Sequence, residues 1–176
     1  MTAQDQSLDA SSVLNARFAP DGRPLSLAWT YTPRELLADG VIHVVGVSLG
    51  VIGALALTIS AALSNLAPAE QVAVGVYAAG LVAMLGTSAA YNMCPVGRLK
   101  WRLRRADHAT IFLMIAGTYT PLVTLVGTDS FAFGLLAGIW LVATAGAAVK
   151  LTLPGRFDRL AIGLYLALGW SGLMAY

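Results

Sequence analysis

The sequence predicts an all-α fold, a polytopic transmembrane helical bundle with five spans and a cytoplasmic N-terminus. Apolar runs lie at 41–63, 71–93, 108–127, 131–149 and 160–176, and each is close to the roughly 20 residues that cross a hydrocarbon core as a helix. The chain is 57% hydrophobic and only 11% charged, with a mean hydropathy of +0.72. A soluble domain is about a quarter charged, so the composition excludes an ordinary soluble enzyme or binding domain.

The basic residues agree with this topology. If the chain crosses the membrane at every apolar run, all 11 Lys and Arg residues fall on one side of it. Positively charged segments stay in the cytoplasm, so residue 1 is expected inside, Tyr176 outside, and the host membrane is expected to be a plasma membrane of bacterial type. The basic residues form three groups: Arg17, Arg23 and Arg34 before the first run; Arg98, Lys100, Arg102, Arg104 and Arg105 between the second and third; and Lys150, Arg156 and Arg159 between the fourth and fifth.

The chain divides into a polar tail and a membrane domain. Residues 1–33 are polar and mixed in charge, and we expect them to form a cytoplasmic tail, while residues 34–176 form the transmembrane domain. Thr32-Pro33-Arg34-Glu35 predicts a helix start, because the Thr32 and Glu35 side chains can each cap the other's backbone and Pro33 suits the first helical position. The Arg98–Arg105 cluster is expected to form a cytoplasmic loop and is interpreted as a topological signal that meets anionic lipid, not as a nucleic-acid patch.

A few polar residues in the apolar runs lie at one depth, near the cytoplasmic boundary. Two pairs are spaced four residues apart and share a helix face, and a third pair opens the third run. One interpretation is a functional site, because ionisable groups at membrane depth usually line a cavity. The other, favoured for Asp39, is that these groups are solvated among headgroups, with Asp107 as the N-cap of the third helix. The pairs are Asp39 and His43, Ser88 and Asn92, and Asp107 and His108.

The same polar residues belong to longer motifs. These are Glu35 to Gly46, then Ser88-Ala-Ala-Tyr91-Asn92, then Asp107-His108 continuing to Gly117-Thr118-Tyr119-Thr120-Pro121, and finally Tyr165 to Trp170. Together they resemble the hemolysin III family, which belongs with the progestin and adiponectin receptor superfamily. The resemblance covers roughly residues 34 to 170.

The resemblance implies a seven-helix fold with a zinc site near the cytoplasmic side. The family pattern binds zinc through a His four residues after the Ser of the second helix and through an H-x-x-x-H in the last helix, while an Asp opening the third helix holds a metal-bound water. By this resemblance Ser88 and Asp107 take the catalytic positions, and Asn92 and Asp107 the metal-site positions. Asn92 replaces the His, and the sequence contains no H-x-x-x-H. We therefore expect a chain that lacks the last two helices of the family and holds zinc weakly, and we predict no other cofactor.

Three functions remain open from the sequence. The first is a hemolysin III-type integral membrane protein without catalysis of its own, for which the family label implies cytolysis. The second is a zinc-dependent lipid or amide hydrolase of the superfamily type, and the third is a sensor or receptor of lipid state. Membrane lipids are the expected partners. Gly46-Val47-Ser48-Leu49-Gly50 has the spacing of a close helix contact and is interpreted as packing within the chain, so the oligomeric state stays open.

Overall fold

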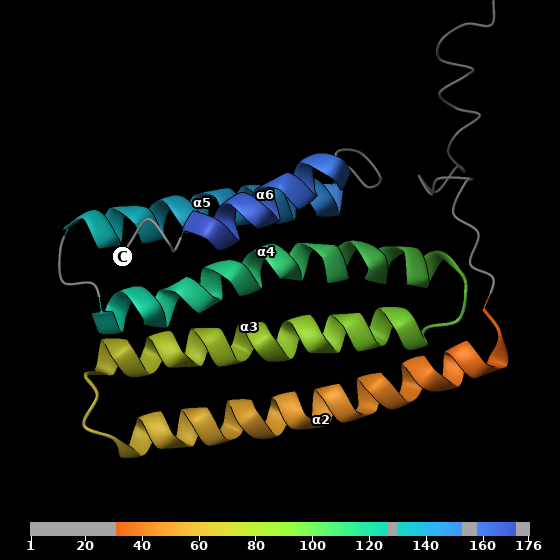
Figure 1. The fold of residues 1–176 in the computed structure, drawn as a ribbon, viewed down its shortest axis with the longest axis horizontal. Helices are drawn as coiled ribbons and strands as arrows, with labels where there is room; N and C mark the ends of the chain where they lie inside the picture. Colours follow the sequence, from red (N-terminus) through yellow and green to blue (C-terminus); the bar gives the residue numbers. More distant parts are fainter. Residues whose placement is uncertain (1–30, 127–129, 153–157, 172–176) are drawn as a thin grey trace, which may run out of the picture.

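The computed structural model describes residues 31–126, 130–152 and 158–171, and every element in these ranges is a helix (Figure 1). Each helix runs antiparallel to the one that precedes it in the chain (Figure 1). The expected tail, apart from its last residues, lies outside the described residues. The helices are α2 (Pro33–Leu63), α3 (Pro68–Met93), α4 (Arg98–Val126), α5 (Ser130–Thr152) and α6 (Asp158–Ser171).

The predicted helical membrane fold is confirmed. Four of the described helices, α2 to α5, are long and apolar enough to cross a membrane. The fifth, α6, has 14 residues, or about 21 Å at 1.5 Å per residue. That is shorter than the hydrocarbon core, and the rest of the run predicted at 160–176 lies outside the described residues.

The start of α2 follows the predicted capping box. The Glu35 backbone amide donates to the Thr32 hydroxyl at 3.3 Å, and the Thr32 amide donates to the Glu35 carboxylate at 2.7 Å. Pro33 occupies the first helical position, where its missing N–H costs nothing. The first helix therefore begins well before its apolar run and carries its polar first turns out of the hydrocarbon region.

The third apolar run was predicted to start at residue 108, but the helix that contains it starts earlier. α4 begins at Arg98, so Asp107 lies inside the helix and the N-cap interpretation is wrong. The residues from Arg98 onward include strong helix formers, and Pro95 and Gly97 lie in the irregular segment that precedes them. The basic cluster is thus a helical extension and not a loop.

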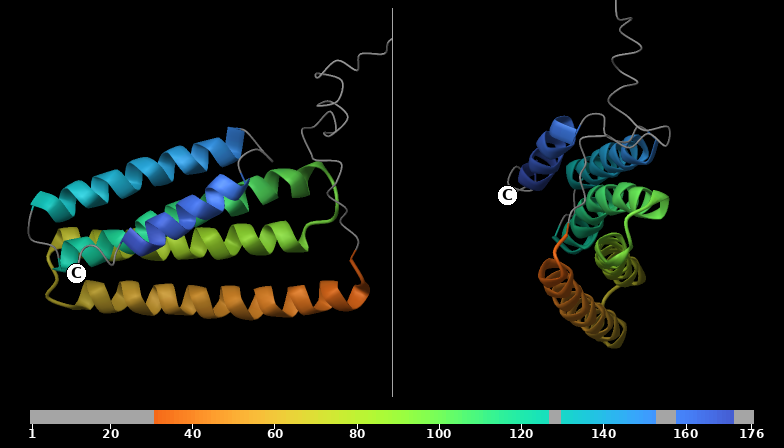
Figure 2. Two further views of the ribbon diagram at one scale, coloured as in Figure 1. Left: turned by 45° about the horizontal axis from the view of Figure 1, so that its top comes forward. Right: turned by 90° about the vertical axis from the view of Figure 1, so that its right-hand side faces the viewer.

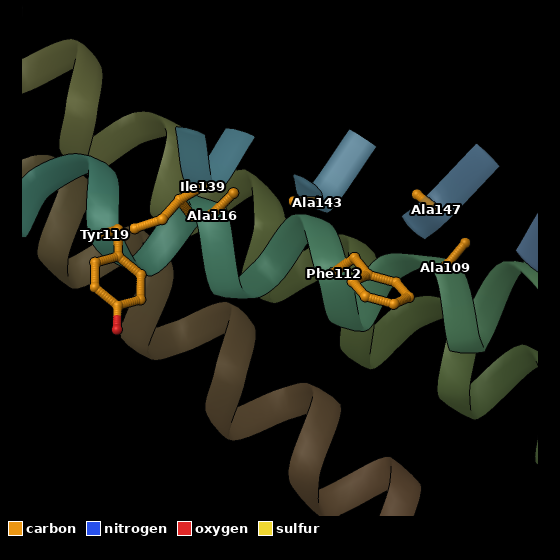
Figure 3. Close-up of a cluster of buried hydrophobic side chains, with 7 residues drawn as sticks. All are labelled: Ala109, Phe112, Ala116, Tyr119, Ile139, Ala143 and Ala147. Carbon is orange, nitrogen blue, oxygen red and sulfur yellow. The ribbon is translucent and has the colours of Figure 1, made fainter. Parts of the chain in front are cut away.

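α4 is the centre of the bundle. It packs against α3 on one side and α5 on the other, α2 packs against α3, and α6 lies obliquely beside α4 (Figure 2). Small residues allow these contacts, since a Cβ on Gly50 of α2 would collide with Leu85 of α3. The α4–α5 core consists of Ala109, Phe112, Ala116, Tyr119, Ile139, Ala143 and Ala147 (Figure 3).

The Gly117 to Pro121 motif serves this packing. The Tyr119 hydroxyl donates to the Gly169 carbonyl of α6 at 3.1 Å, and the Thr120 hydroxyl accepts from the Trp140 indole of α5 at 3.1 Å. Gly117 brings α4 close to the α3 backbone, because its Cβ would lie 3.6 Å from the Val76 carbonyl oxygen. This end of the motif therefore joins four helices and is structural.

Candidate functional site

Three helices place polar side chains together at one end of the bundle, where α2 and α4 begin and α3 ends. We call this the basic end, because it carries Arg34 and the Arg98–Arg105 cluster. His43 of α2 and Asp107 of α4 each lie about 15 Å along their helix from its start, at 1.5 Å per residue. α3 runs the opposite way and brings Ser88 and Asn92 to this level from its last turns.

His43 is held in one tautomer by its neighbours. Its Nδ1 lies 2.7 Å from the Asp39 backbone oxygen, an acceptor only, so Nδ1 carries the proton and Nε2 presents a lone pair. Asn92 Nδ2 lies 3.1 Å from that Nε2 and also donates to the Ser88 backbone oxygen at 2.9 Å. The Ser88 carbonyl thereby fixes the nitrogen of the Asn92 amide, not its oxygen, toward His43.

The Ser88 hydroxyl lies between two proton acceptors. Its Oγ is 3.5 Å from His43 Nε2, and it also lies near enough to the Asp107 carboxyl to act on it electrostatically. Asp107 is half-buried, and His43, His108 and Arg104 act electrostatically on its carboxyl. A serine hydroxyl, an oriented imidazole and a carboxylate thus meet in a partly desolvated place, where electrostatic interactions are stronger than in water.

Two of the six polar residues contribute differently. Asp39 bonds His43 through its backbone oxygen, while its carboxylate lies near Tyr31, where burial, Tyr91 and Asp39 together raise the pKa of the Tyr31 phenol. The His108 backbone oxygen accepts from the Tyr165 hydroxyl of α6 at 2.9 Å. The side chains assigned to the candidate site are therefore His43, Ser88, Asn92 and Asp107.

Lys100 is a residue that the sequence analysis missed. It was grouped with the topological charges, yet its side chain is only 1% exposed, and its ammonium group donates to backbone carbonyls at the end of α3. The signal was present, since Pro95 has no N–H to offer the last turn of the preceding helix.

Zinc, which the family resemblance implies, does not fit these residues. Zinc prefers three or four His, Cys or carboxylate ligands, and the described residues hold no group of three such side chains close enough to share a metal. Asn92, at the family's ligand position, turns its amide nitrogen toward His43, and an amide nitrogen is not a ligand. No chemical step at this site is therefore assigned to a metal.

We expect elemental analysis of the detergent-purified chain to give substoichiometric zinc. Asn92→His should not restore full occupancy, because it adds one imidazole to a set that still lacks a third strong ligand. Stoichiometric zinc that survives dialysis against a mild chelator would contradict this expectation. It would mean that His43, Asp107 and Cys94 rearrange around a metal.

Comparison with known proteins identifies a family and two relatives. The family model described as Haemolysin-III related matches residues 32–176. The chain is similar to the hemolysin-3 homolog of Bacillus subtilis (strain 168), with 29% identity over 146 residues that cover 82% of this chain and 68% of the relative. It is also similar to hemolysin-3 of Bacillus cereus, with 28% identity over 142 residues, 81% of this chain and 64% of the relative. The chain thus spans about two thirds of the length of these relatives, and no solved structure matches it.

Proposed function

Because the chain belongs to the hemolysin III family, we propose that it is an integral membrane protein that acts on the lipid bilayer it spans. The name hemolysin, carried by the Bacillus cereus relative, denotes membrane lysis, and we propose the same activity here. The observation that carries the proposal is the convergence of His43, Ser88, Asn92 and Asp107 at the basic end. Burying polar groups at that depth costs free energy, so such groups usually line a functional site.

The basic end suits the headgroup of an anionic lipid. Arg98 and Arg102 are exposed on the first turns of α4, and Arg104 and Arg105 are partly exposed. Arginine pairs with phosphate through parallel hydrogen bonds, and clustered basic residues beside a span favour anionic lipid. A phosphate held by these arginines would place the glycerol or acyl region of the lipid near the polar site.

Dye release from vesicles tests the proposal. We expect the purified chain to release an entrapped fluorophore from vesicles with anionic lipid faster than from purely zwitterionic ones. Protein-free vesicles and vesicles with an unrelated four-helix membrane protein serve as controls. Release no faster than in these controls, at equal lipid-to-protein ratio, would refute lysis by this chain.

For orientation, we propose a plasma membrane of bacterial type with the basic end in the cytoplasm. The support is the distribution of Lys and Arg, which leaves the α2–α3 connection without either, as is typical of a connection outside the cytoplasm.

A reporter active only in the cytoplasm tests this orientation. Fused after Gly155 it should be active, and fused after Pro68, at the start of α3, it should be inactive. The opposite pattern would reverse the topology and place the polar site at the outer leaflet.

A second candidate function is hydrolysis of an acyl lipid without a metal. The observation in its favour is the Ser88 Oγ to His43 Nε2 distance of 3.5 Å, with His43 oriented through Nδ1, which follows the arrangement of nucleophile, base and orienting group. Ser88 would attack the acyl carbonyl while its proton passes to His43 Nε2, replacing the Asn92 amide hydrogen bond at that nitrogen. The proton would then pass to the leaving alcohol, and water would release the acyl group.

An alkyl fluorophosphonate probe separates the candidates. Labelling that Ser88→Ala abolishes would favour hydrolysis, whereas absence of labelling in a protein that lyses vesicles would leave lysis alone. A protein that neither lyses nor reacts, but whose thermal stability depends on acyl-chain order, would be the lipid-state sensor.

A further inference from the structure

The buried ammonium group of Lys100 caps the C-terminal end of α3. Its Nζ donates to the backbone oxygens of Tyr91 at 2.8 Å, Asn92 at 3.1 Å and Cys94 at 3.0 Å. An ammonium group has three donors, so these three bonds use all of them. A cation at a helix C-terminus also meets the negative end of the helix dipole. The buried charge is therefore fully paired.

The sequence explains why α3 needs this partner. The last carbonyls of a helix have no intrahelical donor. The Tyr91 oxygen would be reached by the amide of the residue four positions later, but that residue is Pro95, which has no N–H. Lys100 supplies the missing donor from the first turn of α4. It thus fixes the end of α3 and ties it to α4.

The same ammonium group reaches the residue before α2. It lies 4.9 Å from the centre of the Tyr91 ring and 5.2 Å from that of Tyr31, within the range of cation–π attraction. Tyr31 directly precedes Thr32, the N-cap of α2. One side chain therefore contacts the ends of the three helices that form the polar site.

We propose that Lys100 is a positioning residue that sets the contact between Asn92 and His43. It holds the Asn92 backbone through the carbonyl oxygen, while the Asn92 side chain donates to His43 Nε2. Releasing that carbonyl moves the amide away from the imidazole and frees its lone pair. This inference concerns the geometry of the site and stands whether or not the chain lyses membranes.

Nitrogen NMR of the histidines in the full chain measures the effect directly. The chain has two histidines, so ¹⁵N-histidine labelling gives two ring systems, and His108→Gln assigns them. In the wild type we expect His43 to show a protonated Nδ1 and a hydrogen-bonded, unprotonated Nε2. Lys100→Met should lose the hydrogen-bonded Nε2 signal. Arg102→Met removes the same charge from an exposed position two residues along α4 and should leave the His43 signals unchanged.

Lys100→Arg keeps the charge and decides the matter if Lys100→Met fails to fold. The planar guanidinium cannot point three donors at three carbonyls as an ammonium does, so the His43 Nε2 signal should shift although topology is kept. Wild-type His43 signals in Lys100→Arg, or in a folded Lys100→Met, would overturn the proposal and reduce Lys100 to a topological charge.

Discussion

Gly146→Ala is expected to destabilise the folded bundle by about 1–3 kcal/mol, the usual cost of overpacking a core. Gly146 of α5 faces Phe112 of α4, and a Cβ there would lie 2.6, 2.7 and 2.8 Å from three atoms of the ring. Phe112 is 1% exposed and packs against Tyr165 of α6, with ring centres 4.4 Å apart and ring planes inclined at 49°. The ring therefore cannot yield without disturbing α6. The thermal unfolding midpoint in detergent measures the loss.

Gly138→Ala is the matched control for this substitution. Gly138 lies on the same helix, and a Cβ there would meet nothing within 4 Å. Alanine is a better helix former than glycine, so the midpoint should stay level or rise.

The cause can be tested by relieving the overlap. Phe112→Leu replaces the ring by a smaller side chain. It should itself be destabilising, because it leaves an unfilled space in the core. The pair Gly146→Ala with Phe112→Leu should therefore cost less than the two single changes added together. A strictly additive double variant would place the damage of Gly146→Ala elsewhere than at Phe112.

The sequence predicted the existence of each helix more reliably than the position of its first residue. A span in contact with lipid must be apolar on nearly every face, so runs of hydropathy locate α2 to α5. Hydropathy marks the membrane boundary and not the helix end, because polar residues continue a helix into water at no cost. Arg98–Arg105 was therefore assigned to a loop, although it forms the first turns of α4. Thr32 and Glu35 gave a local signal of the true start of α2.

The site could be predicted in part. Spacings of four residues place Asp39 with His43 and Ser88 with Asn92 on shared faces, and the structure brings three of these residues together with Asp107. Contacts between helices depend on rotation about each axis, which a spacing does not give. For this reason the shared face of Asp39 and His43 did not show that His43 bonds the Asp39 backbone oxygen. It also could not separate the buried Lys100 from the exposed Arg102, since both are basic residues in one cluster.

Asp107→Asn is expected to preserve folding and to lower membrane-directed activity roughly tenfold. The amide has the size of the carboxyl and keeps an oxygen near Ser88, so the packing is kept. What is lost is charge: a hydrogen bond to a charged group contributes about 1.5–3 kcal/mol and a neutral one about 0.5–1.5. The midpoints of these ranges differ by about 1.25 kcal/mol, close to the roughly 1.4 kcal/mol that corresponds to a factor of ten. Asp107 is not an N-cap, so capping cannot account for an effect.

The measurement is the initial rate of dye release from anionic vesicles at equal incorporated protein. Glu70→Gln is the control, because it removes a carboxylate from the first turn of α3, at the opposite end of that helix from Asn92. It should leave the rate unchanged, since Gln can still accept the bond that the Ala67 amide now donates to Glu70. Asp107→Ala should then be no more active than Asp107→Asn, because the charge and not the volume is what the site uses. A full rate in Asp107→Asn would assign Asp107 to packing and remove the carboxylate from the proposed site.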